Sequence, residues 1–328
     1  MPQNNNEVKK IKIAIEGGAG YTAGELIRIL LNHPYADICY INSESHDGQE
    51  VTSVHHDLLG ETNLHFSKIN IKTIDVLFLC KGHGQSAIYL KSNSLPEKLK
   101  IIDLSQDFRQ ENNGFVYGLP ELQRDKIKVA AKIANPGCFA TSIELALLPL
   151  AKAGLLNDDI HVTSTTGSTG AGQSSSETSH FSWRNNNISV YKPFRHQHLT
   201  EIKMSLHKLQ PGFSATINLI PVIGNFSSGI FTSMYTNCTL SQSEIRELFE
   251  IYYKDHPFVF LADHNPDLKQ VINTNKCILF PEKIDNKIFL ISLIDNLLKG
   301  ASGQAVQNMN LIFGLPEDTG LHLKAAAF

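Results

Sequence analysis

Strong charge, paired cysteines and long apolar runs are all missing from this sequence. Its 29 basic and 32 acidic residues leave a net charge of −3, which lacks the concentrated basic surface that attracts nucleic acids or anionic membranes. No stretch approaches the roughly 20 apolar residues needed to cross a bilayer. Residues 1–10 are polar, without the apolar region of a signal peptide. We therefore expect a cytoplasmic protein with neither a nucleic-acid nor a membrane partner.

The five cysteines are widely spaced and include no C-x-x-C pair. An odd number without paired spacing argues against a disulfide framework and against a structural metal site, so we predict no metal. Cys39, Cys80, Cys238 and Cys277 lie in runs typical of strands or strand edges, where cysteine behaves as a small buried hydrophobe. Cys138 is different, because it follows a turn and precedes an apolar helical pattern.

The first third of the chain has the pattern of a doubly wound nucleotide-binding domain. Alternating isoleucines from residue 11 to residue 15 predict a strand that leads into a glycine-rich turn. An amphipathic helix follows and is expected to end near Pro34. Further apolar strands of the kind found in a covered parallel sheet are predicted at residues 38–41, 76–80 and 101–104.

The remainder of the chain predicts a second, α+β domain built on a mixed or antiparallel sheet. Longer strands with alternating hydroxyl and apolar residues are expected at residues 160–165, 215–222, 229–240 and 288–295. Ser241 and Glu244 have capping-box spacing before a helical pattern. A last helix is predicted over residues 303–313, ending at Gly314. The Ser-, Thr- and Gly-rich residues 163–179 are interpreted as a flexible linker.

The glycine-rich turn is a candidate for cofactor binding. A dinucleotide pyrophosphate needs unobstructed backbone N–H groups at the positive end of a helix. Glycines at 17, 18 and 20 provide that room, although Ala23 replaces the third glycine of the usual fingerprint. A tight turn that only packs helix on sheet is the alternative. The predicted cofactor-binding residues here are Gly17, Gly18, Gly20, Tyr21, Thr22 and Ala23.

The choice between NAD and NADP depends on the residues that follow the second strand. Glu44 favours NAD, because a carboxylate there would hold a ribose 2′-hydroxyl. Ser43 and Ser45 favour NADP, because their hydroxyls can donate to a 2′-phosphate. The residues alone leave the choice open.

Cys138 is the candidate nucleophile. It lies between an apolar run at residues 129–134, predicted to be a strand, and a helix predicted over residues 139–150, directly after a Pro-Gly pair. The start of a helix stabilises a thiolate, so we predict a lowered pKa for the Cys138 thiol. The same N–H groups could stabilise an oxyanion. A buried, inert cysteine is the alternative.

A nucleophilic thiol needs a proton acceptor, and His196 and His198 form the densest histidine site of the chain. Either could serve as an acid/base group near neutral pH. Because a helix is predicted from about residue 200, His198 is our prediction for the acid/base. His196 is then expected to hold substrate. Spacing alone gives no means of bringing either histidine to Cys138.

Seven successive segments resemble the signature blocks of the N-acetyl-γ-glutamyl-phosphate reductase family. They are residues 17–26, 102–109, 116–122, 135–141, 167–172, 196–202 and 295–314. The resemblance implies a Rossmann doubly wound parallel sheet, with a second α+β catalytic domain of the glyceraldehyde-phosphate/aspartate-semialdehyde dehydrogenase type. The expected division is 1–137 plus 303–328 for the NADP-binding domain and 138–302 for the catalytic and oligomerisation domain.

The same resemblance implies an activity and a set of site residues. The implied reaction is the NADPH-dependent reduction of N-acetyl-glutamyl 5-phosphate through a thioester on Cys138, with His198 and His196 as the catalytic histidine segment, in a homodimer or homotetramer. Gln173 and Arg195 depart from the family, which commonly has a basic residue and a glycine there. The predicted cofactor set adds Ser43, Ser45, Gly82 and Asn296 for NADP(H), and the predicted substrate set is Ser105, Arg109, Lys192 and Arg195.

Two alternatives stay open. An aspartate-semialdehyde dehydrogenase or an aminoadipyl-phosphate reductase would use the same mechanism on another small acyl phosphate. A non-catalytic NADP-binding sensor would keep the fold and lose the chemistry, and its Cys138 would be unreactive at neutral pH. The acyl group on the substrate is also left open.

Overall fold

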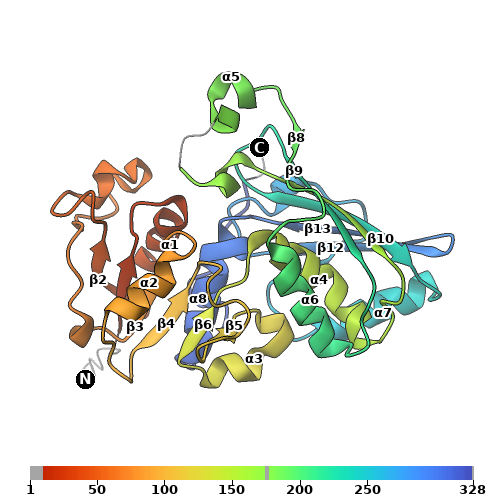
Figure 1. Cartoon of the computed structure of the whole chain (residues 1–328), viewed down its shortest axis with the longest axis horizontal. Helices are drawn as coiled ribbons and strands as arrows, with labels where there is room; N and C mark the ends of the chain where they lie inside the picture. Colours follow the sequence, from red (N-terminus) through yellow and green to blue (C-terminus); the bar gives the residue numbers. More distant parts are fainter. Residues whose placement is uncertain (1–9, 174–176, 327–328) are drawn as a thin grey trace, which may run out of the picture.

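The structure is a computed structural model that describes residues 10–173 and 177–326. Two sheets lie side by side in the molecule, each with its own helices (Figure 1). The α/β fold class predicted from the sequence is confirmed. None of the helices within these residues is long and apolar enough to cross a membrane.

The first sheet has six strands in the order β2-β1-β3-β4-β6-β5, and all its pairings are parallel. Its central strand, β3, is buried along its whole length, as expected where helices cover both faces of a sheet. The strands are β1 (Ile11–Glu16), β2 (Ala36–Asn42), β3 (Val76–Leu79), β4 (Lys100–Asp103), β5 (Val116–Tyr117) and β6 (Lys132–Ala134).

The helices of this domain include one from the far end of the chain. Helix α8 contacts both α1 and α3, so the C-terminal helix returns to the first sheet (Figure 1). Helix α1 ends three residues before Pro34 and helix α8 two residues before Gly314, whose φ is +71°. Both ends agree with the sequence prediction. The helices are α1 (Tyr21–Leu31), α2 (Gln85–Ser92), α3 (Pro120–Val129) and α8 (Gly303–Ile312).

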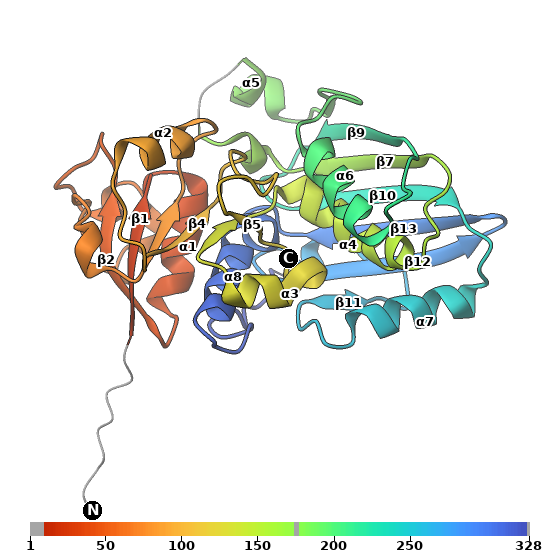
Figure 2. The ribbon, with the colours of Figure 1, turned by 60° about the horizontal axis from the view of Figure 1, so that its bottom comes forward.

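The second sheet is mixed, with seven strands in the order β11-β12-β13-β10-β7-β9-β8. Helix α4 packs against β10, β12 and β13, and α6 packs against α4, so both lie over one face of the sheet (Figure 2). The strands are β7 (Ile160–Thr166), β8 (Ser189–Val190), β9 (Ile217–Ile223), β10 (Ile230–Asn237), β11 (Val259–Leu261), β12 (Cys277–Ile284) and β13 (Lys287–Ile294). The helices are α4 (Cys138–Lys152), α5 (Phe181–Arg184), α6 (His198–Leu209) and α7 (Gln242–Tyr253), the last with the predicted capping box.

Three local predictions are corrected by the structure. Residue 129 ends helix α3 rather than starting a strand, because α3 supplies the apolar Ile127 to the core and only residues 132–134 reach the sheet. The predicted linker at 163–179 begins inside β7, whose backbone pairs on both sides; its residues 174–176 lie outside the described residues. Helix α6 begins at His198, two residues earlier than predicted.

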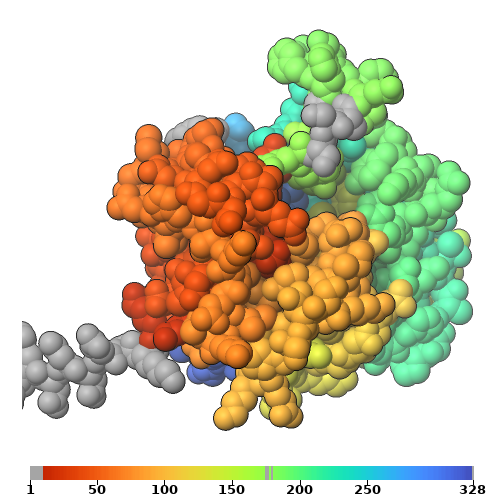
Figure 3. Space-filling view, turned by 60° about the vertical axis from the view of Figure 1, so that its left-hand side comes forward, coloured from red at the N-terminus to blue at the C-terminus, as the bar shows by residue number. Residues whose placement is uncertain are grey.

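A short segment around α5 projects from the second domain. In the space-filling view it rises above the first domain, at the upper right (Figure 3). Its apolar side chains are unusually open to solvent, since Phe181 is 75% exposed and Trp183 is 50% exposed.

A buried ion pair joins the first domain to the segment that precedes α8. Lys299 lies in a π-helical turn, η7 (Leu298–Ser302), and its Nζ donates to Oε1 of Glu121 at 2.8 Å and to Oε1 of Gln307 at 2.9 Å. Both charged side chains are fully buried. Either charge alone would be buried without solvent and without a counter-charge. Each residue is therefore stabilised in the folded protein by the other.

Replacing Lys299 with Met should therefore destabilise the protein strongly. We expect a loss of about 3–5 kcal/mol in the free energy of unfolding, because Glu121 is left buried and unpaired. Urea unfolding measures the loss. Glu250→Gln is the matched control, since its pair with Arg246 is solvent-exposed and should contribute less than about 1 kcal/mol. Equal losses in the two variants would contradict this account.

Candidate functional site

Cys138 is the first residue of α4, and Gly137 is the N-cap of that helix. The thiol therefore sits beside the free N–H groups of the first turn, as the sequence predicted. The η7 turn packs against it from the other side. A Cβ atom on Gly300 would lie 2.8 Å from the Cβ of Cys138, so only glycine fits there without displacing the cysteine.

A buried ion pair lies directly behind the cysteine. Arg109 donates from its Nη1 to Oε1 of Glu201 at 3.0 Å, and from Nε to the Asn135 carbonyl at 2.9 Å. Oε2 of Glu201 accepts from the backbone N–H of Gly137 at 3.0 Å. The residue before Cys138 is thus held by a side chain of α6, from the second domain.

The structure brings both predicted histidines to this point. Their rings pack on Phe139, the residue after the cysteine, with centroids 5.2 Å (His196) and 6.1 Å (His198) away. His198 also abuts Gly137, since a Cβ on that glycine would lie 2.4 Å from Nε2 of the histidine. The backbone N–H of His198 donates to Nδ1 of His196 at 3.3 Å.

Both histidines are neutral at neutral pH. Burial lowers the pKa of His196 to about 4, and the positive charges of Lys192 and Arg109 act in the same direction. Burial and then Arg109 lower the pKa of His198 well below its usual value. A neutral imidazole at either position can accept a proton.

The prediction of a lowered thiol pKa is wrong for the free chain. Burial raises the pKa of Cys138 to about 11, while Arg109 and the N–H of Phe139 act in the opposite direction without outweighing it. The thiol is therefore protonated at neutral pH, although part of Cys138 remains accessible. The sequence indicates the helix terminus, which lowers the thiol pKa, but it does not indicate how deeply the cysteine is packed, which raises the pKa.

The predicted substrate residues divide into exposed and buried groups. Lys192 and Arg195 are exposed on the loop before α6, and Lys192 has a φ of +44°, an unusual backbone conformation that often marks functional loops. Ser105 is buried, and its hydroxyl donates to Asp103 at 2.7 Å. Arg109 is buried beside the cysteine. Ser105 is thus engaged inside the protein, whereas Arg109 and Lys192 lie close enough to the two histidines to lower their pKa values.

The glycine turn fits a dinucleotide pyrophosphate. Gly17 has a φ of +85° and its Cβ would lie 2.8 Å from the Cys80 carbonyl oxygen, while a Cβ on Gly18 would clash with Ile41. Gly20, the N-cap of α1, has open space around it. The first two glycines thus allow close packing, and the third leaves the end of the helix free for phosphate groups.

The remaining predicted cofactor residues of the first turn differ in exposure. Tyr21 is exposed at the start of α1, whereas Ala23 is buried in the core. The carbonyl of Thr22 accepts from the Ser302 hydroxyl at 2.7 Å, which ties α1 to η7. What these residues offer to a cofactor is therefore their peptide groups at the start of the helix rather than their side chains.

Polar groups gather where β2 and β3 end. The hydroxyls of Ser43 and Ser45 both lie near Nδ1 of His46, at 3.0 and 2.9 Å. Nζ of Lys81 lies 2.8 Å from Glu16 and 3.5 Å from Glu44. The carboxyl ends of parallel strands are where nucleotides bind in such sheets.

Of the two further predicted cofactor residues, Gly82 directly follows Lys81, whereas Asn296 lies in the second domain. Gly82 is exposed, with open space around it. Asn296 is buried, accepts from the N–H of Gly229 at 2.6 Å and donates to Thr169 at 3.0 Å. Its amide therefore ties together loops of the second domain.

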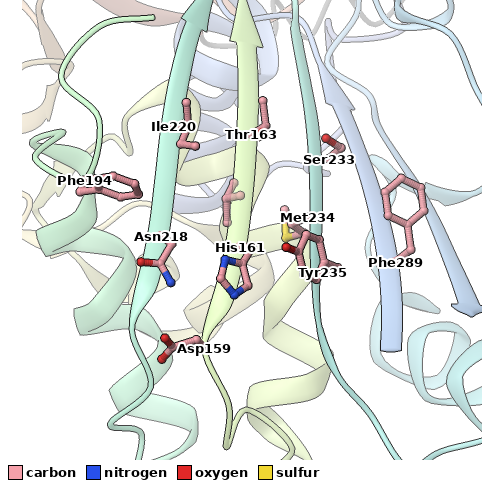
Figure 4. Close-up of a pocket in the computed structure, with 11 residues that line it drawn as sticks. Asp159, His161, Thr163, Phe194, Asn218, Ile220, Ser233, Met234, Tyr235 and Phe289 are labelled. Carbon is pink, nitrogen blue, oxygen red and sulfur yellow. The ribbon is translucent and has the colours of Figure 1, made fainter. Parts of the chain in front are cut away.

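A groove on the second sheet lies away from the cysteine. It crosses β7, β9, β10 and β13, and is lined by side chains such as His161, Asn218 and Tyr235 (Figure 4). Thr232 faces α4 through its hydrogen bond to Ser142, at 2.9 Å. Since side chains alternate along a strand, Tyr235 points to the opposite face, where the groove lies.

Several functional residues were missed from the sequence. Glu201 lies three residues after His198 on α6, a spacing that puts both on one helical face and could have suggested it. His46 follows the two serines and could also have been considered. Lys81 had no local signal, because only the order of strands in the sheet brings it beside Glu16 and Glu44.

Family comparisons match both domains. Residues 12–130 match the family described as "Semialdehyde dehydrogenase, NAD binding domain". Residues 138–296 match the one described as "Semialdehyde dehydrogenase, dimerisation domain". A nicotinamide cofactor is therefore supported for the first domain.

Similar curated proteins cover the whole length. Proteins named N-acetyl-gamma-glutamyl-phosphate reductase from Parabacteroides distasonis and Bacteroides fragilis are 60% and 54% identical over 321 residues. One from Flavobacterium johnsoniae is 52% identical over 324 residues. Each alignment covers 97% of this chain and 100% of the relative.

Solved structures show the same fold at low identity. Aspartate semialdehyde dehydrogenase II from Vibrio cholerae aligns with a TM-score of 0.72 at 15% identity, over 93% of this chain and 99% of that one. Aspartate semialdehyde dehydrogenase from Candida albicans, solved with NADP, aligns with a TM-score of 0.69 at 12% identity, with the same coverage. The predicted fold type is confirmed.

Proposed function

The chain belongs to the N-acetyl-gamma-glutamyl-phosphate reductase family, and from that premise we propose that Cys138 is its nucleophile and His198 its acid/base. The reaction is the reduction of N-acetyl-glutamyl 5-phosphate to N-acetyl-glutamate 5-semialdehyde and phosphate. The expected division at residues 137/138 and 302/303 is retained as part of this proposal.

Each side chain has a chemical step in this proposal. The sulfur of Cys138 bonds to the acyl carbon as His198 takes the thiol proton, and the carbon–oxygen bond to phosphate breaks when the resulting tetrahedral oxyanion collapses to the thioester. The N–H groups at the start of α4 stabilise the negative oxygen. A nicotinamide cofactor held by the first domain would supply the hydride that reduces the thioester. As the thiohemiacetal oxyanion then collapses to the aldehyde, the carbon–sulfur bond breaks and His198 returns the proton to sulfur.

One observation supports the proposal most strongly. Arg109 and His198, which are far apart in the sequence, both approach Gly137, the residue before the cysteine. A Cβ on Gly137 would lie 2.6 Å from Nη1 of the arginine and 2.4 Å from Nε2 of the histidine. A sensor without chemistry would have no need of this convergence. The aspartate-semialdehyde alternative is weaker, since those structures share only 12–16% identity with the chain.

The nucleophile is tested by Cys138→Ser. Turnover of acyl phosphate, followed as NADPH oxidation, should fall by more than about a hundredfold, because a serine hydroxyl is far less acidic than a thiol. NADP(H) binding should survive. Cys39→Ser, on β2, is the matched control and should change kcat by less than about twofold. Retained turnover in Cys138→Ser would remove the nucleophile assignment.

The histidines are separated by pH–rate profiles of His198→Asn and His196→Asn. Since the base must be neutral and its pKa is lowered, kcat/KM of the wild type should fall with acidification only below about pH 6.5. His198→Asn should abolish this limb. His196→Asn should keep it and raise KM. The opposite pattern would exchange the two roles.

We further propose NADP(H) as the cofactor, with Ser43 and Ser45 donating to the 2′-phosphate. Lys81 supports this choice, because its ammonium lies at the same edge of the sheet and within 3.5 Å of Glu44. The Glu44 side chain is 86% exposed, so it can turn away from a phosphate into solvent.

Kinetics with the two cofactors test this choice. The kcat/KM for NADPH should exceed that for NADH by at least about tenfold, since one charge-assisted hydrogen bond contributes about 1.5–3 kcal/mol. Ser45→Ala should reduce the value for NADPH and leave that for NADH, whereas Ser53→Ala, a nearby exposed serine, should change neither. A preference for NADH would show that Glu44 sets the choice.

We also propose that the groove on the second sheet binds a second copy of the chain in a homodimer. His161 and Tyr235 stack on this face with ring centroids 4.9 Å apart, and Phe194 beside them is 57% exposed. The family match over residues 138–296 carries the description of a dimerisation domain. A two-fold interface would set this face, with its aromatic rings, against itself.

Tyr235→Glu should therefore shift the protein toward monomer in sedimentation velocity, because two copies would bring like charges together in an apolar interface. Ile251→Glu is the control: it is 61% exposed on α7, away from this face, and should leave the sedimentation coefficient unchanged. A dimer that survives Tyr235→Glu would contradict this interface.

A further inference from the structure

Behind the turn that leads to Cys138, three polar side chains from three elements meet in the core. Tyr117 on β5 and Glu144 on α4 are 0% exposed, and Glu201 on α6 is 3% exposed. The Tyr117 hydroxyl lies 2.9 Å from Oε2 of Glu201. It also lies 3.2 and 3.0 Å from Oε1 and Oε2 of Glu144. All three contacts are within hydrogen-bond distance.

The number of hydrogens does not suit two ionised carboxylates. A phenol hydroxyl has one hydrogen, and an ionised carboxylate can only accept. If both glutamates were ionised, one of them would face the oxygen lone pairs of Tyr117 without a hydrogen between them. If one carboxyl group is protonated, it donates to the tyrosine, and the tyrosine donates to the other. Each glutamate then has one hydrogen between it and the phenol.

The surrounding charges decide which glutamate keeps the proton. Glu201 accepts from the Arg109 guanidinium and from the N–H of Gly137, which favour its ionised form. Burial, and then the charge of Glu201, raise the pKa of Glu144 well above its usual value. The hydroxyls of Ser205 and Tyr117 and the charge of Lys208 oppose this shift and are outweighed. Lys208 itself is paired with Glu111 at 2.7 Å.

We propose that Glu144 is a positioning residue that acts as a neutral carboxylic acid, donating to Tyr117 so that Tyr117 donates to Glu201. The single negative charge of the cluster is then kept on Glu201, where it holds Arg109 and the peptide before Cys138. This inference deepens the proposed function, and its effect on turnover rests on the proposed role of Cys138. The protonation of Glu144 does not depend on that role.

Stability against pH tests the protonation directly. An unfolded glutamate has a pKa near 4.3, so above about pH 5 the wild type must release the Glu144 proton when it unfolds. Its unfolding equilibrium constant, divided by that of Glu144→Gln, should therefore rise with pH from about pH 5, by about tenfold per pH unit, until the pH reaches the pKa of Glu144 in the folded protein. Both full-length proteins are unfolded in urea. A ratio that stays flat would overturn the proposal.

The double variant Glu121→Gln/Lys299→Met is the matched control, because it removes an equally buried glutamate together with its cation and leaves neither charge unpaired. Burial raises the pKa of Glu121, but the charges of Lys299 and His256 and the hydrogen bonds to its carboxylate together outweigh burial, and the pKa is lowered. Glu121 is thus ionised in both folded and unfolded chains above about pH 5, and the ratio for the double variant should not change over that pH range. The infrared spectrum of the wild type should contain the C=O band of a protonated carboxyl group that Glu144→Gln lacks and the double variant retains. Absence of this band would also overturn the proposal.

The positioning role is tested by rescue. Glutamine keeps a donor toward Tyr117, so kcat/KM of Glu144→Gln should fall by less than about threefold, whereas Glu144→Leu should lose more than about tenfold, at 1.4 kcal/mol per tenfold for a lost buried hydrogen bond. Equal activity of the two variants would overturn the positioning role. Turnover retained in Cys138→Ser would instead overturn the proposed function and leave the protonation of Glu144 intact.

Discussion

The carboxylate of Glu201 is the interaction on which the site depends. It comes from α6 in the second domain, yet it binds Arg109 from the loop after β4 and the peptide N–H of Gly137. It thereby fixes the cation and the first turn of α4 relative to each other. A buried charge of this kind must be compensated from every side, because truncating any partner leaves an unpaired charge without solvent. The geometry around Cys138 is consequently determined by electrostatic balance as much as by packing.

The same need for compensation explains how the domains are joined. Lys299 and Glu121 form a second buried pair, which anchors the η7 turn that packs on Cys138 through Gly300. The cysteine is therefore enclosed between two segments that ion pairs hold in place, one through Glu201 and one through Lys299. The position of α8 follows from this arrangement, because the chain that leaves η7 continues directly into that helix.

Much of the fold was predictable from the sequence, because its signals are local. Strand β1, the glycine turn and α1 follow one another within some twenty residues. Helix α8 ends just before Gly314, a glycine that adopts the left-handed conformation. Val129 was assigned wrongly, because an apolar run does not reveal whether it ends a helix or begins a strand. The convergence of Cys138, Arg109 and the histidines required strand order and domain packing, which no local pattern encodes. Glu144 lies in the apolar helix α4, and nothing in the sequence indicated that it would meet Tyr117 and Glu201 in the core.

The pKa values change how the thiol must be activated. With the pKa of Cys138 raised to about 11 and that of His198 lowered well below its usual value, a thiolate–imidazolium pair is unfavourable in the free chain. Burial raises the pKa of the thiol and lowers that of the imidazole for one reason: it disfavours the charged form of each group, whichever sign the charge has. Transfer of the proton before attack would therefore leave two charges in a site that solvates neither. If instead the proton leaves sulfur while the bond to the acyl carbon forms, the negative charge moves onto the carbonyl oxygen at the start of α4, where N–H groups stabilise it. The burial that argues against a resting thiolate thus favours general-base attack, in which charge develops only where the helix can receive it.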